Sequence, residues 1–352
     1  MAVSSATLSF ESTAPAVEYR PALDGLRAIA VLAVFVFHLN HRWLPGGFVG
    51  VDIFFVLSGY LITSIILRDC EQNRFTFGRF YQRRIARLVP AFFAVSLATL
   101  CGALFIYSNQ DAASAGATLS AAVASLANLK FMWQGNYFVL SPDAQPYLHC
   151  WSLSVEEQFY LIYPAAFLLL YWKARSVRTH VLIAVLVLSL FSCILVTYIR
   201  PEWAFYLLPT RAWELLAGAV LVASNREIRP AKFTSTIPLV GLVAIGFSIF
   251  WISEGPGFPG LVATLPVVGT TCFLLPYEKS HCLTERILSW WPLALIGRMS
   301  YSLYMWHWPI FFLVDYRFYA ASPVFRLALK VSLSVIATTV CFFILRLRVV
   351  HI

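Results

Sequence analysis

Residues 19–39 read YRPALDGLRAIAVLAVFVFHL, and this stretch decides the architecture of the chain. The run is apolar except near its ends, and a segment that crosses a bilayer must be helical because lipid offers its backbone no hydrogen-bond partners. Arg27 and His38 lie eleven residues apart in it, which is about three turns and about 16 Å along a helix axis. We therefore expect both side chains on one face of a membrane helix, which suggests a function beyond spanning.

The composition of the whole chain agrees with a membrane protein. Of its 352 residues, 60% are hydrophobic and 12% are charged, whereas a soluble domain holds about 25% charged residues. Three long segments, 181–199, 233–253 and 255–277, contain no Asp, Glu, Lys or Arg. Because apolar runs of this length cross lipid as helices, the sequence predicts an all-α, polytopic bundle of transmembrane helices.

About ten segments have the length and hydropathy of membrane spans. They are residues 22–40, 48–67, 90–107, 156–172, 181–199, 207–223, 236–252, 260–276, 294–314 and 327–345. Residues 117–133 are an eleventh candidate, but counting them would place the basic loop 173–180 outside, against the positive-inside rule. We interpret 117–133 as an interfacial or re-entrant helix, with both termini in the cytoplasm. Residues 1–18 are expected to be a flexible tail, and residues 19–352 one membrane domain.

The net charge and the cysteines exclude several other classes of function. The charge of +9 does not indicate a nucleic-acid partner, because Lys and Arg lie in loops between apolar runs, as cytoplasmic loops require. The seven cysteines are widely spaced, without a CxxC pair or the spacing of His and Cys metal ligands. Neither a disulfide framework nor a metal site is therefore predicted, and the lipid bilayer is the expected surrounding.

Polar residues in the first two spans allow a structural and a functional interpretation. Arg27 could snorkel to the lipid headgroups, which is the common role of an arginine at a helix end. His38 in an apolar span is costly and usually faces a cavity or a partner. The second run, LPGGFVGVDIFFVLSGYLIT (44–63), holds Asp52 and glycines that permit close helix packing. Asp52 could be the counter-ion of a nearby cation, and it is also a candidate for contact with a substrate.

Residues 68–90 read RDCEQNRFTFGRFYQRRIARLVP and contain six arginines but only two acids. Membrane topology and contact with anionic lipid explain some of these arginines. Arg84 and Arg87, however, are three residues apart on one helical face beside a span. Arginine at every basic position favours planar, multidentate recognition of phosphate. We therefore predict that Arg83, Arg84 and Arg87 bind a phosphate-bearing nucleotide ligand.

A third polar stretch, LHCWSLSVEEQFYLIYP (148–164), enters the fourth predicted span. Ser154 and Glu157 have the spacing of a capping box, which is a purely structural use. Glu156 has no such explanation, and a carboxylate there could orient the imidazole of His38 for acid–base chemistry. His149 and Glu157 are candidates for contact with a substrate.

Two later motifs are PTRAWELLAG (209–218) and GRMSYSLYMWHWP (297–309). Arg211 and Glu214 are three residues apart in a span, and we interpret them first as a structural ion pair. The second motif contains Tyr301, His307 and Trp308. Its aromatic side chains could form a belt at the membrane interface, or they could stack on a sugar ring as part of a substrate site.

Taken together, the motifs resemble the acyltransferase-3 family of integral membrane acyltransferases. The resemblance rests on six motifs in order between about residues 19 and 345. They are RPxLDGLRAxAV with Arg27 and His38, GGFxGVDxFFVxSGYLIT, the Arg84-x-x-Arg87 pair, WSLSVEEQFY, RxWEL and SYSLYxWHWP.

The resemblance implies a bacterial inner-membrane enzyme that O-acylates, most often O-acetylates, a cell-envelope glycan. Lipopolysaccharide O-antigen, peptidoglycan and exopolysaccharide are the acceptors of such enzymes, and acetyl-CoA or another cytoplasmic acyl-CoA is the expected donor. By motif match, His38 and Arg27 correspond to the essential pair of the family, and Arg84 and Arg87 to its RxxR motif. Glu156 and Glu157 fall in its SLSVEEQ segment.

Similar proteins often continue with an acid–proline signature, an eleventh helix and an SGNH-type domain. This chain ends FFILRLRVVHI, so a separate SGNH-type domain is a candidate partner. A lipid-linked sugar flippase without acyl chemistry remains the alternative function. It would use the same basic loop for a pyrophosphate and the same aromatic residues for a sugar, but it would not consume acyl-CoA.

Overall fold

The computed structural model describes residues 19–134, 145–174, 176–224, 236–255, 257–275 and 283–349. All regular secondary structure in these ranges is helical, which confirms the predicted all-α class. The predicted tail, residues 1–18, lies outside the described residues. In chain order the helices are α1 (Pro21–Leu39), the 3-10 helix η1 (Gly47–Val49), α2 (Gly50–Glu71), α3 (Phe77–Ile106), α4 (Asn109–Val123), α5 (Ala127–Gln134), α6 (Cys150–Lys173), α7 (Arg178–Ile199), α8 (Pro201–Tyr206), α9 (Leu208–Ala223), α10 (Ile237–Trp251), α11 (Thr264–Leu274), α12 (Leu283–Leu288), α13 (Trp291–Arg317) and α14 (Pro323–Val349).

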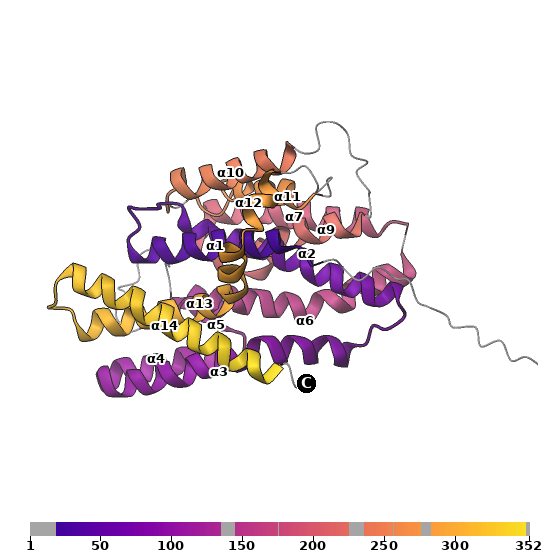
Figure 1. Cartoon of the computed structure of the whole chain (residues 1–352). Coiled ribbons are helices and arrows are strands. Elements are labelled where there is room, and N and C mark those ends of the chain that lie inside the picture. Colours follow the sequence, from indigo (N-terminus) through magenta and orange to yellow (C-terminus); the bar gives the residue numbers. More distant parts are fainter. Residues whose placement is uncertain are drawn as a thin grey trace, which may run out of the picture.

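The predicted spans coincide with α1, α2, α3, α6, α7, α9, α10, α11, α13 and α14. Within the described ranges, 6 helical segments are long and apolar enough to cross a membrane, and α10 and α11 are shorter apolar helices. Helices α6 and α13 have 24 and 27 residues but carry charged side chains within their length. The chain is therefore a polytopic bundle, in which α10, α11 and α12 lie at one side and α3, α4 and α14 at the other (Figure 1).

Residues 117–133 do not form one helix. Helix α4 ends at Val123, a turn follows, and α5 begins at Ala127. Two helices of 15 and 8 residues would measure about 22 Å and about 12 Å, less than the hydrocarbon thickness of about 30 Å. The segment therefore cannot cross a bilayer as a continuous helix, in agreement with its exclusion from the predicted spans.

The predicted span 260–276 is helical only from Thr264. Residues 257–263 form turns, and Phe258 within them is buried against Phe48 and Phe205, with ring centroids 4.7 Å and 6.3 Å away. Proline and glycine flank this phenylalanine and disfavour helix. Irregular backbone is tolerated at membrane depth where protein buries it, and here it places an aromatic side chain in the interior.

Helices α2 and α9 pack with their backbones in contact. A Cβ atom on Gly59 would lie 1.7 Å from the carbonyl oxygen of Leu215, and one on Gly218 would lie 2.0 Å from that of Val56. Only glycine fits at these two positions, and small residues are what allow membrane helices to approach this closely. The close approach brings the polar residues of α9 against those of α2.

Helix α1 packs along α13. The ring centroids of Phe35 and Phe311 are 5.3 Å apart in an edge contact, and the imidazoles of His38 and His307 are stacked with centroids 5.2 Å apart. The first and thirteenth helices are distant in sequence, so this contact joins two of the polar motifs.

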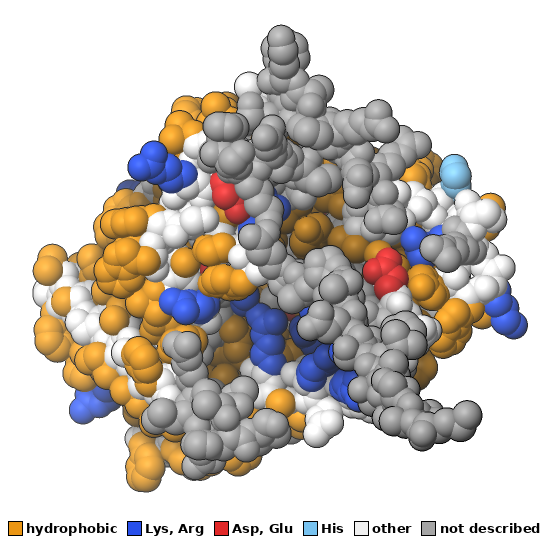
Figure 2. All heavy atoms as spheres, turned by 45° about the vertical axis from the view of Figure 1, so that its right-hand side comes forward, with side chains coloured by type: hydrophobic (Ala, Val, Ile, Leu, Met, Phe, Trp, Pro, Cys, Tyr) orange, Lys and Arg blue, Asp and Glu red, His pale blue; other side chains and the backbone are white. Residues whose placement is uncertain are grey.

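The surface of the bundle separates apolar and basic regions. Large hydrophobic side chains are exposed around it, for example Phe105 at 91%, as expected for a lipid-facing surface. Figure 2 shows Lys and Arg side chains gathered beside a hollow on the face that comes forward from the right-hand side of Figure 1. Helices α2 and α3 meet on that side, and the first turns of α3 carry Arg79, Arg83, Arg84 and Arg87. Two residues of this basic region, Arg84 and Arg87, line a cavity of the bundle.

Candidate active site

Two adjoining cavities lie between the helices. The first, here called the arginine cavity, has a volume of about 780 Å³ and is lined by Arg27, Arg84, Arg87, Glu156 and Tyr301 among others. The second, here called the histidine cavity, has a volume of about 380 Å³ and is lined by His38, Asp52, His149, Arg211 and Phe258 among others. Val51 and Tyr304 line both cavities, so these two side chains form the partition between them.

Helix α1 contributes a polar residue to each cavity. Arg27 lines the arginine cavity and His38 the histidine cavity. Both residues therefore face the interior of the bundle, as their spacing in the helix predicts. The second residue lies about 16 Å further along the axis, so a ligand that contacts both must be elongated.

The arginine cavity carries an excess of positive charge. Three guanidiniums line it, whereas Glu156 is the one carboxylate in its lining. Among the described residues Arg84 and Arg87 form no ion pair, and the Nε atom of Arg84 is buried without a hydrogen-bond partner. Arg27 has only a distant contact, 3.7 Å, from its Nη1 to Oδ1 of Asp24. Such a cavity suits an anion, because guanidiniums with free donors bind phosphate or carboxylate oxygens strongly.

Glu156 does not contact His38. Its carboxylate accepts hydrogen bonds from Oγ of Ser58 at 2.8 Å and from the hydroxyl of Tyr160 at 3.0 Å, within the arginine cavity. The prediction that Glu156 orients His38 is therefore wrong. The reason is that α6 begins at Cys150 rather than near residue 156, so Glu156 lies about 9 Å further along the bundle than the start of the helix.

His38 and His149 line the histidine cavity, and His307 lies against both of them. Nδ1 of His38 lies 3.1 Å from Nε2 of His307, and Nδ1 of His307 lies 3.1 Å from the carbonyl oxygen of Leu303. His149 packs against His307 with ring centroids 5.8 Å apart, and the ring of Trp308 meets that of His38 edge-on at 4.6 Å. Nε2 of His38 and both ring nitrogens of His149 are buried without a hydrogen-bond partner. These nitrogens are free to bind a polar ligand.

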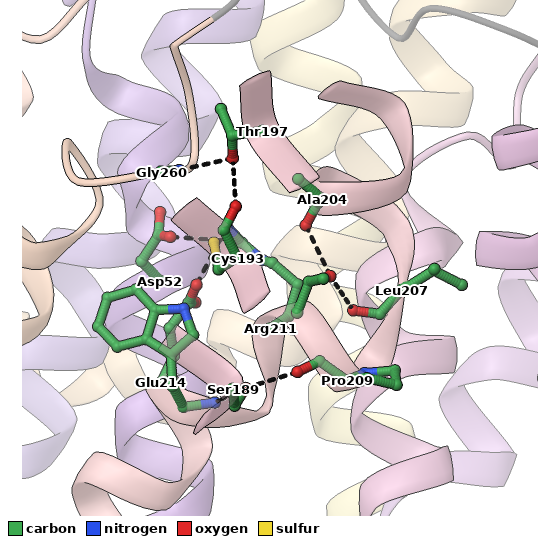
Figure 3. Close-up of polar contacts among 12 residues, drawn as sticks. Asp52, Ser189, Cys193, Thr197, Ala204, Leu207, Pro209, Arg211, Glu214 and Gly260 are labelled. Carbon is green, nitrogen blue, oxygen red and sulfur yellow. Dashed lines mark hydrogen bonds and ion pairs between the residues drawn. The ribbon is translucent and has the colours of Figure 1, made fainter. Parts of the chain in front are cut away.

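Arg211 forms the other polar part of this cavity. Its Nη2 donates to Oδ1 of Asp52 at 3.0 Å, and its Nη1 lies 3.0 Å from Oε1 of Glu214 (Figure 3). The predicted pairing of Arg211 with Glu214 is confirmed, and so is the prediction that Asp52 is the counter-ion of a cation. The guanidinium also lies 5.4 to 5.8 Å from the centroids of four aromatic rings, those of Phe55, Trp151, Phe205 and Phe258. Its charge is therefore balanced within the protein, unlike the charges of the arginine cavity.

Some predicted site residues lie away from both cavities. Arg83 pairs with Asp69, and Glu157 accepts a hydrogen bond from Ser125. The predicted capping box is wrong, because Ser154 lies inside α6 and its Oγ accepts from the backbone N–H of Ala127 at 3.2 Å.

The two aromatic candidates of the last motif have different positions. Tyr301 lines the arginine cavity, and its hydroxyl donates to the carbonyl oxygen of Leu88 at 3.2 Å. Trp308 donates from Nε1 to the carbonyl oxygen of Gln145 at 3.0 Å while its ring packs on His38. The aromatic residues of this motif therefore line the polar interior rather than forming a belt.

Tyr304 belongs to the aromatic stretch of the last motif, but the sequence did not single it out as a site residue. Its hydroxyl is 2.7 Å from Oγ of Ser152 and donates to the carbonyl oxygen of His149 at 3.1 Å, while its ring forms part of the partition. The signal was present, since Tyr304 and His307 are three residues apart and share a helical face. Among the described residues no group of three or more His, Cys, Asp or Glu side chains has the arrangement of a metal site.

The fold and the cavities define a helical membrane protein with an arginine-lined cavity and a buried imidazole cluster. The chain belongs to the acyltransferase-3 family, because the family model, described as an acyltransferase domain, matches residues 20–347.

Comparison with curated proteins gives relatives of known name. The chain is 34% identical over 343 residues to the peptidoglycan O-acetyltransferase OatA of Listeria monocytogenes, covering 92% of this chain and 55% of the relative. It is 32% identical over 345 residues to the O-acetyltransferase OatA of Staphylococcus aureus, covering 92% and 56%. The chain thus spans about half the length of these relatives. No solved structure matches it.

Proposed function

We propose that this protein transfers an acetyl group from acetyl-CoA in the cytoplasm to a hydroxyl of a cell-envelope glycan on the opposite side of the inner membrane. Peptidoglycan is the acceptor we favour, because it is named for the Listeria relative. The observation that carries the proposal is that Arg27 and His38, on one helix, line two adjoining cavities. One cavity has unpaired cations, and the other has unpaired imidazole nitrogens.

The arginine cavity is the proposed site of the donor. Arg84, Arg87 and Arg27 would hold the phosphates of the CoA, because a planar guanidinium can make two parallel hydrogen bonds to a phosphate. The pantetheine arm would extend along α1 past Val51 and Tyr304. The thioester would then lie beside His38, while the charged part of the donor would remain at the basic face shown in Figure 2. Both termini of the chain would then lie in the cytoplasm, in line with the positive-inside rule.

The histidine cavity is the proposed site of the chemistry. His38 acts as general base on the acceptor hydroxyl, or it carries the acetyl group as a covalent intermediate. His149 and Asp52 line the same cavity and would contact the acceptor. The Asp52–Arg211–Glu214 group would hold one wall of the cavity rigid. Such positioning contributes to catalysis because reacting atoms must be held close together.

The test is mass spectrometry of envelope glycans from cells with and without this protein. We expect one added acetyl group per modified unit, lost in a His38→Ala variant because general-base help is worth on the order of 10²–10⁴-fold. His41→Ala is the matched control, since His41 is exposed three residues away and lines neither cavity. Glycans with the same acetyl content in all four strains would contradict the proposal. Export of a lipid-linked sugar that survives His38→Ala would instead support the flippase.

A further inference from the structure

Each ring nitrogen of His307 has one polar contact. One of these contacts determines which nitrogen carries the proton. Nδ1 lies 3.1 Å from the carbonyl oxygen of Leu303, one turn earlier in α13. A carbonyl oxygen can only accept a hydrogen bond, so Nδ1 of His307 must carry the proton. In a neutral imidazole the other nitrogen is then an acceptor.

The surroundings of His307 favour the neutral ring. Its side chain is buried and forms no ion pair among the described residues. The rings of Phe35, Phe311 and Tyr304 surround it at centroid distances of 6.2, 5.7 and 5.5 Å. A charge buried without a counter-ion is costly, so an imidazolium is disfavoured at this position.

The proton on His307 determines the proton on His38. Nε2 of His307 is an acceptor, and Nδ1 of His38 lies 3.1 Å from it. If Nδ1 of His38 were also unprotonated, two lone pairs would face each other at hydrogen-bond distance. Nδ1 of His38 is therefore the donor, and its Nε2 is left with a bare lone pair. That nitrogen is buried without a partner, and the residue lines the histidine cavity.

We propose that His307 is a positioning residue that fixes the tautomer of His38 and so directs the unprotonated Nε2 of His38 into the histidine cavity. The inference rests on the proposed function, because the free lone pair is what acyl transfer requires there. As the acceptor oxygen bonds to the thioester carbon, its proton moves to Nε2. The C–S bond breaks, and the departing thiolate takes the proton back from Nε2.

The arrangement parallels a catalytic triad with a neutral third member. In the serine proteases a carboxylate accepts from Nδ1–H of the catalytic histidine and holds the required tautomer. Here a backbone carbonyl orients a second imidazole, which does the same without adding a charge to the membrane interior. The edge contact of Trp308 with His38 restricts the ring further.

A first experiment reads the tautomer itself. The full chain, with ¹⁵N-labelled histidine, is placed in lipid bilayers for solid-state NMR, and the signals of His38 are assigned by their loss in a His38→Gln variant. We expect an unprotonated Nε2 and a protonated Nδ1 on His38. The opposite assignment would overturn the inference. This readout needs no turnover, so it decides the inference even if wild-type protein transfers no acetyl group and the proposed function fails.

A second experiment uses two amides of different reach at position 307. The amide of His307→Gln reaches the position of Nε2 and can accept from His38, whereas that of His307→Asn reaches only the position of Nδ1. We expect His307→Asn to lower kcat for acetyl transfer by on the order of 10²–10⁴-fold with KM for acetyl-CoA unchanged, and His307→Gln to stay within about tenfold of wild type. Thermal unfolding of each variant identifies any loss of fold. Equal kcat in two folded variants would contradict a positioning role.

Discussion

The two cavities differ in how the protein treats buried charge. In the histidine cavity, Arg211 is fully buried, paired with two carboxylates and surrounded by aromatic rings. In the arginine cavity, Arg84 and Arg87 have no carboxylate partner among the described residues. Charged side chains that are paired within the protein stabilise its fold, whereas hydrogen-bond donors without a partner remain available to bind a ligand. This difference agrees with the proposal that the histidine cavity is the site of the chemistry and the arginine cavity the site of a charged donor.

The largest expected effect is on stability, at the paired cation. Replacing Arg211 with Leu would leave Asp52 and Glu214 buried without a counter-ion, which costs about 3–5 kcal/mol of unfolding free energy. The measurement is thermal or chemical unfolding in detergent. A triple variant with Leu at positions 52, 211 and 214 removes all the charges and should recover much of the loss. An Arg211→Leu protein as stable as wild type would show that the guanidinium does not stabilise this part of the histidine cavity.

A smaller effect is expected at the unpaired cations, on donor binding rather than stability. Arg84→Ala should raise KM for acetyl-CoA by roughly 10- to 100-fold, because one hydrogen bond to a charged group is worth about 1.5–3 kcal/mol. Arg83→Ala is the matched control, since Arg83 pairs with Asp69 and does not line the cavity. If both variants change KM equally, the basic region attracts the donor through its overall positive charge and Arg84 makes no specific contact with it.

The smallest effect is expected at the partition. Tyr304→Phe keeps the ring but removes the hydroxyl that bonds Ser152 and the backbone of His149. We expect a loss of about 0.5–1.5 kcal/mol, seen as a several-fold fall in kcat. Tyr316→Phe is a control, because the hydroxyl of Tyr316 bonds Asp111 outside both cavities. No change in kcat for Tyr304→Phe, or an equal change in both variants, would show that the hydroxyl of Tyr304 does not contribute to catalysis.

Local sequence patterns predicted the side-chain directions that depend on a single helix. The eleven-residue spacing of Arg27 and His38 placed both toward the interior, and the three-residue spacing of Arg84 and Arg87 placed both on the same cavity. Arg211 and Glu214 paired for the same reason. In each case the period of the α-helix determines the direction of the side chains, whatever the neighbouring helices do.

Contacts between residues of different helices could not be predicted from local patterns. The partner of His38 was expected on α6, but it lies on α13, because the axial offset of one helix against another depends on packing over the whole bundle. His149, just before α6, reaches the histidine cavity, whereas Glu156 lies too far along that helix. Phe258 reaches the same cavity from turns that begin just before the predicted span 260–276 and continue into it.

The most direct measurement is a cryo-EM structure of the full chain in lipid with acetonyl-CoA, an analogue whose C–S bond cannot be cleaved by acyl transfer. We expect the phosphates against Arg84 and Arg87, the pantetheine arm between Val51 and Tyr304, and the acetonyl carbonyl beside Nε2 of His38. Phosphates bound at Arg79 and Arg83 with the acetonyl group directed toward lipid would contradict the claim that the two cavities form one path.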